Sequence, residues 1–185
     1  MICESVGAAR SVGIPIDAND FELFELPLRF TQDRAVIDAR WKALQLQVHP
    51  DRFMTQGDAA HRIAMQWAIR VNEAYQRLSN PLSRAAYLCQ LHGQSMGAET
   101  RHDVAPEILV QQMGWRETLE RATTLTDVDI LGSEVDTRWR ELQAGLATLL
   151  DERRDWLAAA TQITALMFIE RLILDIERHR ESLNE

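Results

Sequence analysis

The chain has 185 residues, of which 46% are hydrophobic and 26% charged, and its formal net charge is −8. This size and apolar content suffice for one ordinary domain or two small ones, and they exclude a chain that is disordered throughout. The negative excess lies in residues 93–185, which hold 10 Lys and Arg against 18 Asp and Glu, whereas residues 1–92 are balanced at 10 and 10. Nucleic acid is therefore not expected as a partner, because a phosphate backbone is bound by clustered positive charge.

The chain carries no clear targeting or membrane signal. Its first ten residues include an acidic residue and lack the apolar core and cleavage pattern of a secretory signal. No apolar run approaches the roughly 20 residues that span a bilayer, so no membrane partner is expected and a cytoplasmic location fits best. The two cysteines, Cys3 and Cys89, belong to no CxxC metal pair, and Cys89 is expected to be a small buried residue of a helix.

The first half of the chain is predicted to be an antiparallel helical hairpin with short flanking helices. Residues 1–18 are expected to form a flexible tail, followed by a short apolar turn that Pro27 stops. In the second helix, four apolar residues recur at steps of four, three and four and predict one buried face, namely Ile37, Trp41, Leu44 and Val48. Asp58 is expected to be the N-cap of the third helix, and Asn80-Pro81 should start the fourth. The predicted helices cover residues 33–48, 58–78 and 81–93.

The second half is predicted to be a three-helix bundle, so that the fold class is all-α. Residues 94–104 are small and polar and are expected to link two domains, which would then occupy residues 19–93 and 105–185. The helices of the second domain are expected at residues 105–122, 127–150 and 153–182. Three antiparallel helices are the simplest arrangement for elements of these lengths joined by short loops.

A His49-Pro50-Asp51 tripeptide stands between the second and third predicted helices. Proline keeps the preceding residue out of the α-helical conformation, so His49 ends its helix, and Pro50 fixes its own φ. Asp51 is then displayed as a charged side chain at the tip of a stiff hairpin, beside Arg40 and Lys42. Such a display favours docking on another protein over catalysis. Chance alone would produce the tripeptide in about one chain in a hundred of this length, so a merely polar turn is the less favoured alternative.

The tripeptide and the helices around it, residues 19–93, resemble the J-domain family. In that family the loop and the second helix dock on a DnaK-type chaperone and promote its hydrolysis of ATP. Carried over by position, the resemblance implies that His49, Pro50 and Asp51 form the essential loop. It also implies that three basic residues, Arg40, Lys42 and Arg52, support the docking by their charge.

Three further segments narrow the resemblance to HscB-type J-domain co-chaperones of iron–sulfur cluster assembly. These segments are residues 21–27 (FELFELP), 78–88 (LSNPLSRAAYL) and 91–93 (LHG). The chain departs from the type at Asp20, where an aromatic residue is usual, and at Glu25, where glycine is usual. The resemblance implies two partners, an HscA-type chaperone and the scaffold protein IscU, and no iron of its own.

The second domain has more apolar surface than one bundle seam covers. Leu109, Val110 and Met113 form a row displaced from the inward stripe of their helix, and surplus apolar surface on a small domain marks an interface. From the pattern alone, a bundle that buries both rows, or a dimer, fits equally well. The resemblance favours the interface, because HscB proteins bind their scaffold through the matching positions, here Leu109, Val110, Met113, Glu117 and Phe168. Gly114 and Arg121 replace residues that are usually acidic.

Other chemistry finds little support in the sequence. None of the five histidines has the spacing of a metal pair, no glycine-rich phosphate loop occurs, and no nucleophile motif is present. We therefore expect no cofactor and no enzymatic activity. Two alternatives remain open beside the HscB-type function. One is a J-domain co-chaperone for a different client protein, and the other is a helical adaptor in which the tripeptide is accidental.

Overall fold

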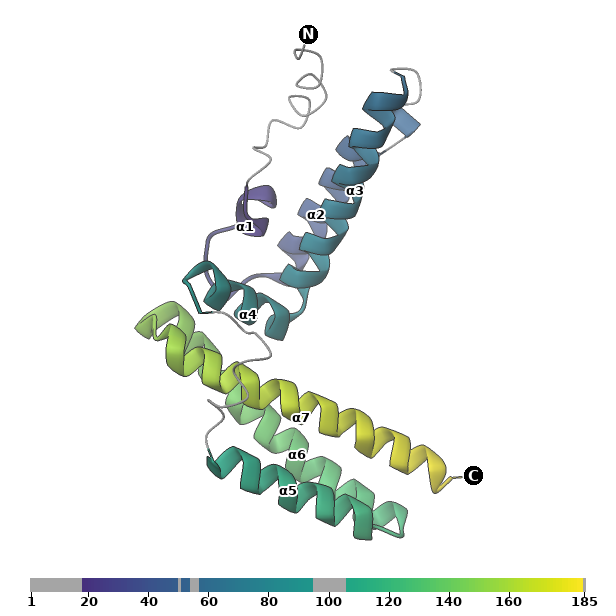
Figure 1. Ribbon diagram of the computed structural model, residues 1–185, viewed down its shortest axis with the longest axis vertical. Coiled ribbons are helices and arrows are strands. Elements are labelled where there is room, and N and C mark those ends of the chain that lie inside the picture. Colours follow the sequence, from purple (N-terminus) through teal and green to yellow (C-terminus); the bar gives the residue numbers. More distant parts are fainter. Residues whose placement is uncertain (1–17, 50, 54–56, 95–105, 185) are drawn as a thin grey trace. The chain divides into compact units, whose positions relative to one another are not determined.

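The structure is a computed structural model that describes residues 18–49, 51–53, 57–94 and 106–184. In these ranges every regular element is a helix, which confirms the predicted all-α class (Figure 1). The chain divides into two compact units between Arg84 and Ala85, inside the fourth helix. Most of the predicted tail and most of the predicted linker lie outside the described residues, so the domain limits inferred from the sequence stay a prediction.

The N-terminal unit is built on a hairpin of α2 (Arg34–Val48) and α3 (Asp58–Ser79), which pack side by side. The short helix α1 (Asp20–Leu23) packs on α3, and α4 (Pro81–Leu91) begins at the end of this unit. The predicted stripe of α2 is confirmed at Ile37, Leu44 and Val48, which are its buried residues. Trp41 is only half-buried, and its indole N–H donates to the side chain of Asn72 on α3. The buried face of α3 consists of Ala64, Trp67, Val71, Ala74 and Leu78.

The helices of this unit begin where short polar or glycine residues permit it. Asp33 caps α2, because its side chain accepts the backbone N–H of Ala35. Asn80 caps α4 in the predicted way, since its side chain accepts the N–H of Ser83 at 2.9 Å. The prediction that Asp58 caps α3 is wrong. Gly57 occupies the cap with φ of 93°, a conformation open to glycine, and Asp58 is the first helical residue, where its charge suits the helix dipole.

Two arginine clusters fix the short elements of the unit to α3. Asp20 is fully buried at the start of α1, and its carboxylate lies 2.5 Å from Arg70 and 2.6 Å from Arg77 of α3. Arg84, also buried, donates through Nε to the carbonyl of Phe30 and through Nη1 to that of Leu78. The second bond satisfies a carbonyl that the end of α3 leaves without a helical partner.

The C-terminal unit contains the predicted bundle of three antiparallel helices (Figure 1). These are α5 (Pro106–Arg121), α6 (Leu125–Ala147) and α7 (Trp156–Ser182). The second of them is shorter than predicted, because residues 148–153 form a π-helix that ends at Arg154 in the left-handed conformation. One core cluster joins the three helices and consists of Trp115, Leu119, Ala122, Val128, Leu131, Val135, Ile169, Leu172 and Ile176.

Helix α7 is long and apolar enough, by length and composition, to cross a membrane, with a mean hydropathy of 1.5 in its most apolar window. The expectation that no apolar run approaches this length is therefore wrong by this measure. Much of the apolar character belongs to the bundle core, because α7 buries Ile163, Leu166, Ile169, Leu172 and Ile176. A core helix of a bundle passes the same compositional test as a membrane span.

Candidate functional site

The corner between α2 and α3 displays two residues of the tripeptide. His49 ends α2 with ψ of 123°, outside the helical range, as a residue before proline must. The side chain of Asp51 is 76% exposed, and its carboxylate lies 3.6 Å from Nδ1 of His49. The same ring nitrogen lies 3.4 Å from the backbone N–H of Asp51, which it can accept only when it carries no proton itself. Pro50 lies outside the described residues.

The three basic residues predicted to support the corner have different surroundings. Arg52 donates through Nη1 to the carbonyl of Leu46, which ties the residue after the tripeptide back to the last turn of α2. Arg40 forms an ion pair with Glu25, a contact that the sequence did not reveal. Lys42 is exposed. The hydrogen bond from Tyr75 is the main cause that holds the pKa of Asp38 below its ordinary value, Arg34 adds to it, and the charge of Lys42 makes the smallest contribution.

The predicted scaffold-binding residues are accessible on the C-terminal unit. Leu109, Val110 and Met113 are exposed apolar residues of α5, with 41%, 69% and 64% of their surface accessible. Glu117 follows on the same helix and is also exposed, whereas Phe168 is half-buried on α7, which packs against α5. The α5 residues therefore form an apolar surface whose C-terminal end is polar.

That polar end is close to electrically neutral. Glu117 lies 3.4 Å from Arg121, one turn further along α5, and both side chains are largely exposed. Exposed pairs of this kind contribute little to stability. Gly114, between Met113 and Glu117, leaves open space around its position, since no atom lies within 4 Å of where its Cβ would be. Acidic residues were expected at Gly114 and Arg121. Gly114 instead leaves open space on this surface, and Arg121 instead pairs with Glu117.

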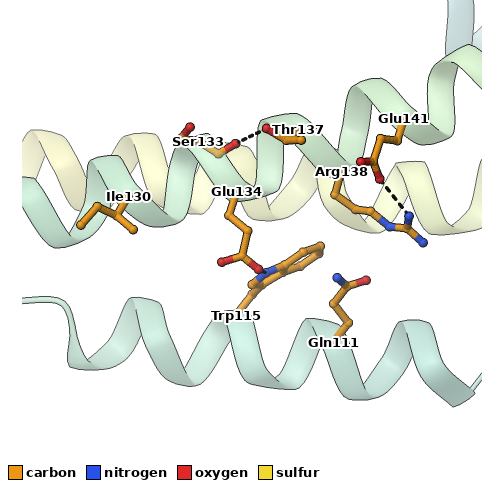
Figure 2. Close-up of a pocket in the computed structure, with 8 residues that line it drawn as sticks. All are labelled: Gln111, Trp115, Ile130, Ser133, Glu134, Thr137, Arg138 and Glu141. Atoms are coloured by element: carbon orange, nitrogen blue, oxygen red, sulfur yellow. Dashed lines mark hydrogen bonds and ion pairs between the residues drawn. The ribbon is translucent and has the colours of Figure 1, made fainter.

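A groove of about 530 Å³ opens between α5 and α6 (Figure 2). The indole N–H of Trp115, reaching across from α5, donates to Glu134 of α6 at 2.8 Å. Arg138 and Glu141 pair at 3.1 Å further along α6. The sequence pattern predicts an inward stripe of α5 through Ile108, Trp115 and Leu119, but not the acidic partner of Trp115, because nothing in the local pattern marks a contact between separate helices. The groove has a mixed polar and apolar lining, and the hydrogen bond from Trp115 to Glu134 joins α5 to α6 in addition to their shared core.

Metal and nucleophile chemistry gain no candidate site in the described part of the chain. Within that part, no three His, Cys, Asp or Glu side chains gather closely enough to hold a metal ion. Burial raises the pKa of the Cys89 thiol to about 11, so the group stays a neutral thiol at physiological pH. A neutral buried thiol is neither a ready nucleophile nor a ready ligand. The corner and the α5 surface remain the two candidate sites, and both suit docking.

Known proteins resemble this chain over most of its length. Residues 104–177 match the family model described as the HSCB C-terminal oligomerisation domain. The Co-chaperone protein HscB homolog of Burkholderia multivorans is 45% identical over 173 residues, which cover 92% of this chain and 98% of that protein. The chain belongs to the HscB family of co-chaperones. Its relatives are named as co-chaperones and not as enzymes.

Solved HscB structures have the same fold. Chaperone HscB from Vibrio cholerae is 36% identical and matches with a TM-score of 0.80 over 90% of this chain and 99% of that one. The human co-chaperone protein HscB is 25% identical, with a TM-score of 0.83 over 89% of this chain and 83% of that one. These matches confirm an N-terminal J-domain-like part and a C-terminal helical part. The roles of individual residues at the two candidate sites remain predictions.

Proposed function

We propose that this HscB-type co-chaperone stimulates the ATPase of a DnaK/HscA-type chaperone and delivers the scaffold protein IscU to it during iron–sulfur cluster assembly. The observation that carries the proposal is the exposed carboxylate of Asp51 at the tip of the α2–α3 hairpin. An exposed charge on a rigid corner can form an ion pair with a partner at little entropic cost. We further propose that the protein acts in the cytoplasm, which cell fractionation would test.

The chaperone would dock on the corner and on α2. His49, Pro50 and Asp51 would provide the essential contact, and Arg40, Lys42 and Arg52 would meet acidic groups of the chaperone. The bond from Arg52 to the carbonyl of Leu46 supports this role, because it stiffens the corner against the end of α2. Charged residues at such a surface mainly set the rate and the specificity of association.

The scaffold would bind the apolar surface of α5 together with Phe168 of α7. Leu109, Val110 and Met113 support this assignment, because large apolar side chains that stay exposed on a small bundle mark interaction sites. Glu117 would add a polar contact at the end of this surface. The protein would then hold the scaffold on one unit and engage the chaperone through the other.

The chaperone half of the proposal is tested by the substitution Asp51→Asn. We expect stimulation of a DnaK/HscA-type ATPase to fall to the unstimulated rate, while helical content stays unchanged because the side chain is exposed. Asp136→Asn is the matched control, since Asp136 is an exposed residue of α6 in the other unit. Full stimulation by Asp51→Asn would refute the assignment of the corner. Absence of stimulation by the unaltered protein would instead support the adaptor alternative.

The scaffold half is tested by the triple substitution Leu109→Ala, Met113→Ala and Phe168→Ala. We expect calorimetric titration with IscU to show at least a tenfold loss of affinity, since two or three apolar anchors carry much of such an interface. Ile130→Ala is the control, because Ile130 is an exposed apolar residue of α6. Unchanged affinity of the triple variant would place the site elsewhere. Absence of any binding by the unaltered protein would favour a different client.

A further inference from the structure

Glu25 adopts a backbone conformation that costs free energy for any residue except glycine. It follows the end of α1 with φ of 51°, in the left-handed region. The N–H of Leu26 donates to the carbonyl of Phe21, and the N–H of Glu25 donates to that of Glu22. These two bonds form a Schellman motif, in which the left-handed position is most often glycine. An interaction of the Glu25 side chain can offset part of this cost.

The side chain of Glu25 has such an interaction with the basic face of α2. Its carboxylate oxygen Oε2 lies 2.5 Å from Nη1 of Arg40, and the two side chains are 67% and 45% exposed. Fixing the end of α1 also fixes the direction in which the Glu25 side chain leaves the backbone. The pair therefore joins the α1 turn to α2. It also engages Arg40, which belongs to the proposed chaperone site.

The other cations of α2 show why one arginine matters there. Arg34 is committed to its own unit, because its Nε pairs with Asp38 at 2.8 Å and its Nη1 donates to the carbonyl of Ser79. Arg40 is paired with Glu25, whereas for Lys42 no ion pair is found among the described residues. The positive charge that α2 offers to a partner therefore depends strongly on whether Arg40 is paired with Glu25.

We propose that Glu25 is an internal competitor at the chaperone site, whose carboxylate competes with an acidic group of the chaperone for Arg40 and so weakens docking. The inference rests on the proposed function, since it presumes that a chaperone docks on α2. A partner must displace the Glu25 carboxylate before it can form a full ion pair with Arg40. A chaperone that uses an acidic group at Arg40 therefore binds more weakly than it would without Glu25.

The test measures the concentration of co-chaperone that gives half-maximal ATPase stimulation. For Glu25→Gln we expect this concentration to fall about two- to fivefold at low salt, the range that corresponds to an exposed ion pair. Glu25→Gly should have the same effect and also relieve the left-handed backbone. The difference should shrink at about 0.5 M salt, where exposed charges are screened. In an Arg40→Ala background, neither change at Glu25 should alter the concentration.

The matched control is Glu73→Gln, which removes one negative charge from an exposed position on α3. An equal improvement by Glu73→Gln would show a general charge effect and overturn the role of Glu25. That role is also overturned if the unaltered protein stimulates the ATPase and Glu25→Gln does not improve on it. Complete absence of stimulation by the unaltered protein would instead overturn the proposed function, and this inference with it.

Discussion

The substitution Asp20→Asn should weaken the N-terminal unit although it changes almost no volume. Asp20 is completely buried, and its two carboxylate oxygens lie 2.5 Å from Arg70 and 2.6 Å from Arg77. Asparagine fits the same space but carries no charge, and its amide nitrogen donates where an arginine needs an acceptor. One arginine therefore loses its acceptor and both lose their counter-charge.

The size of the effect follows from how deeply the partners are buried. Breaking a fully buried ion pair by removing one partner costs about 3–5 kcal/mol. Arg70 and Arg77 keep 31% and 39% of their side-chain surface exposed and can recover part of their hydration. We therefore expect a loss of about 2–3 kcal/mol in the free energy of unfolding of the N-terminal unit. With a urea dependence of about 1–1.5 kcal/mol per M, the unfolding midpoint should fall by roughly 2 M.

The measurement is urea unfolding followed by circular dichroism, with hydrogen exchange to locate the effect. Exchange should accelerate most in α1 and in the part of α3 around Arg70 and Arg77. Asp51→Asn is the matched control, because the same chemical change at an exposed side chain should alter stability by less than about 0.5 kcal/mol. If Asp20→Asn shifts the midpoint no more than this control does, the two short ion pairs do not anchor α1.

Three further expectations concern stability and reactivity. Gly114→Ala should raise the free energy of unfolding by about 0.5–1 kcal/mol in calorimetry, because the added methyl meets open space in mid-helix. Gly145→Ala should raise it less, since its Cβ would lie 2.8 Å from the amide nitrogen of Gln162, which would have to move and weaken its hydrogen bond to the Leu142 carbonyl. Cys89 should react slowly with iodoacetamide at pH 8 in the folded protein and rapidly in urea, as peptide mass spectrometry can show, because burial raises its pKa to about 11. The hydrogen bond from the Thr124 hydroxyl is the largest cause that holds the pKa of Asp127 below its ordinary value. The stability from this cap is therefore complete at pH values above the ordinary pKa, and it is lost as the pH falls through the lower pKa of the folded protein. Asp127→Asn should remove this acid dependence from the urea midpoints, and an unchanged dependence would contradict the role of the cap. Rapid labelling of Cys89 in the folded protein would contradict its burial.

Local pattern sufficed to predict the helices and one of the two expected caps. The steps between Ile37, Leu44 and Val48 identified the buried face of α2, although Trp41 of the same stripe is only half-buried. Asn80-Pro81 identified the start of α4, whereas Asp58 does not cap α3. These features depend on residues within one or two helical turns, so their physics is present in a short stretch of sequence. The exposure of Leu109 and Val110 was one of the alternatives that the pattern left open, and only the resemblance to HscB proteins favoured it.

Contacts between residues far apart in the chain were not predictable in this way. Asp20 meets arginines that are 50 and 57 residues away, and nothing around it marks a buried charge. Glu25 was noted only as a departure from glycine, because its backbone conformation and its contact with Arg40 both require the folded α1 turn. Trp67 of α3 is buried as well, although the stripe predicted for that helix ran through Ala64, Ala68, Val71, Ala74 or Tyr75, and Leu78.

The hydrogen bond between Trp115 and Glu134 bears on how α5 can move relative to α6 and α7. Helices α6 and α7 share the longest contact of the unit, whereas α5 lies against them along a shorter seam, with the open groove on its α6 side. A partner that binds the outer residues of α5 would therefore act on the helix that packs least against the other two. If α5 tilted, it would lose this hydrogen bond and part of the packing of Trp115 and Leu119 in the shared core, while the contact between α6 and α7 would remain.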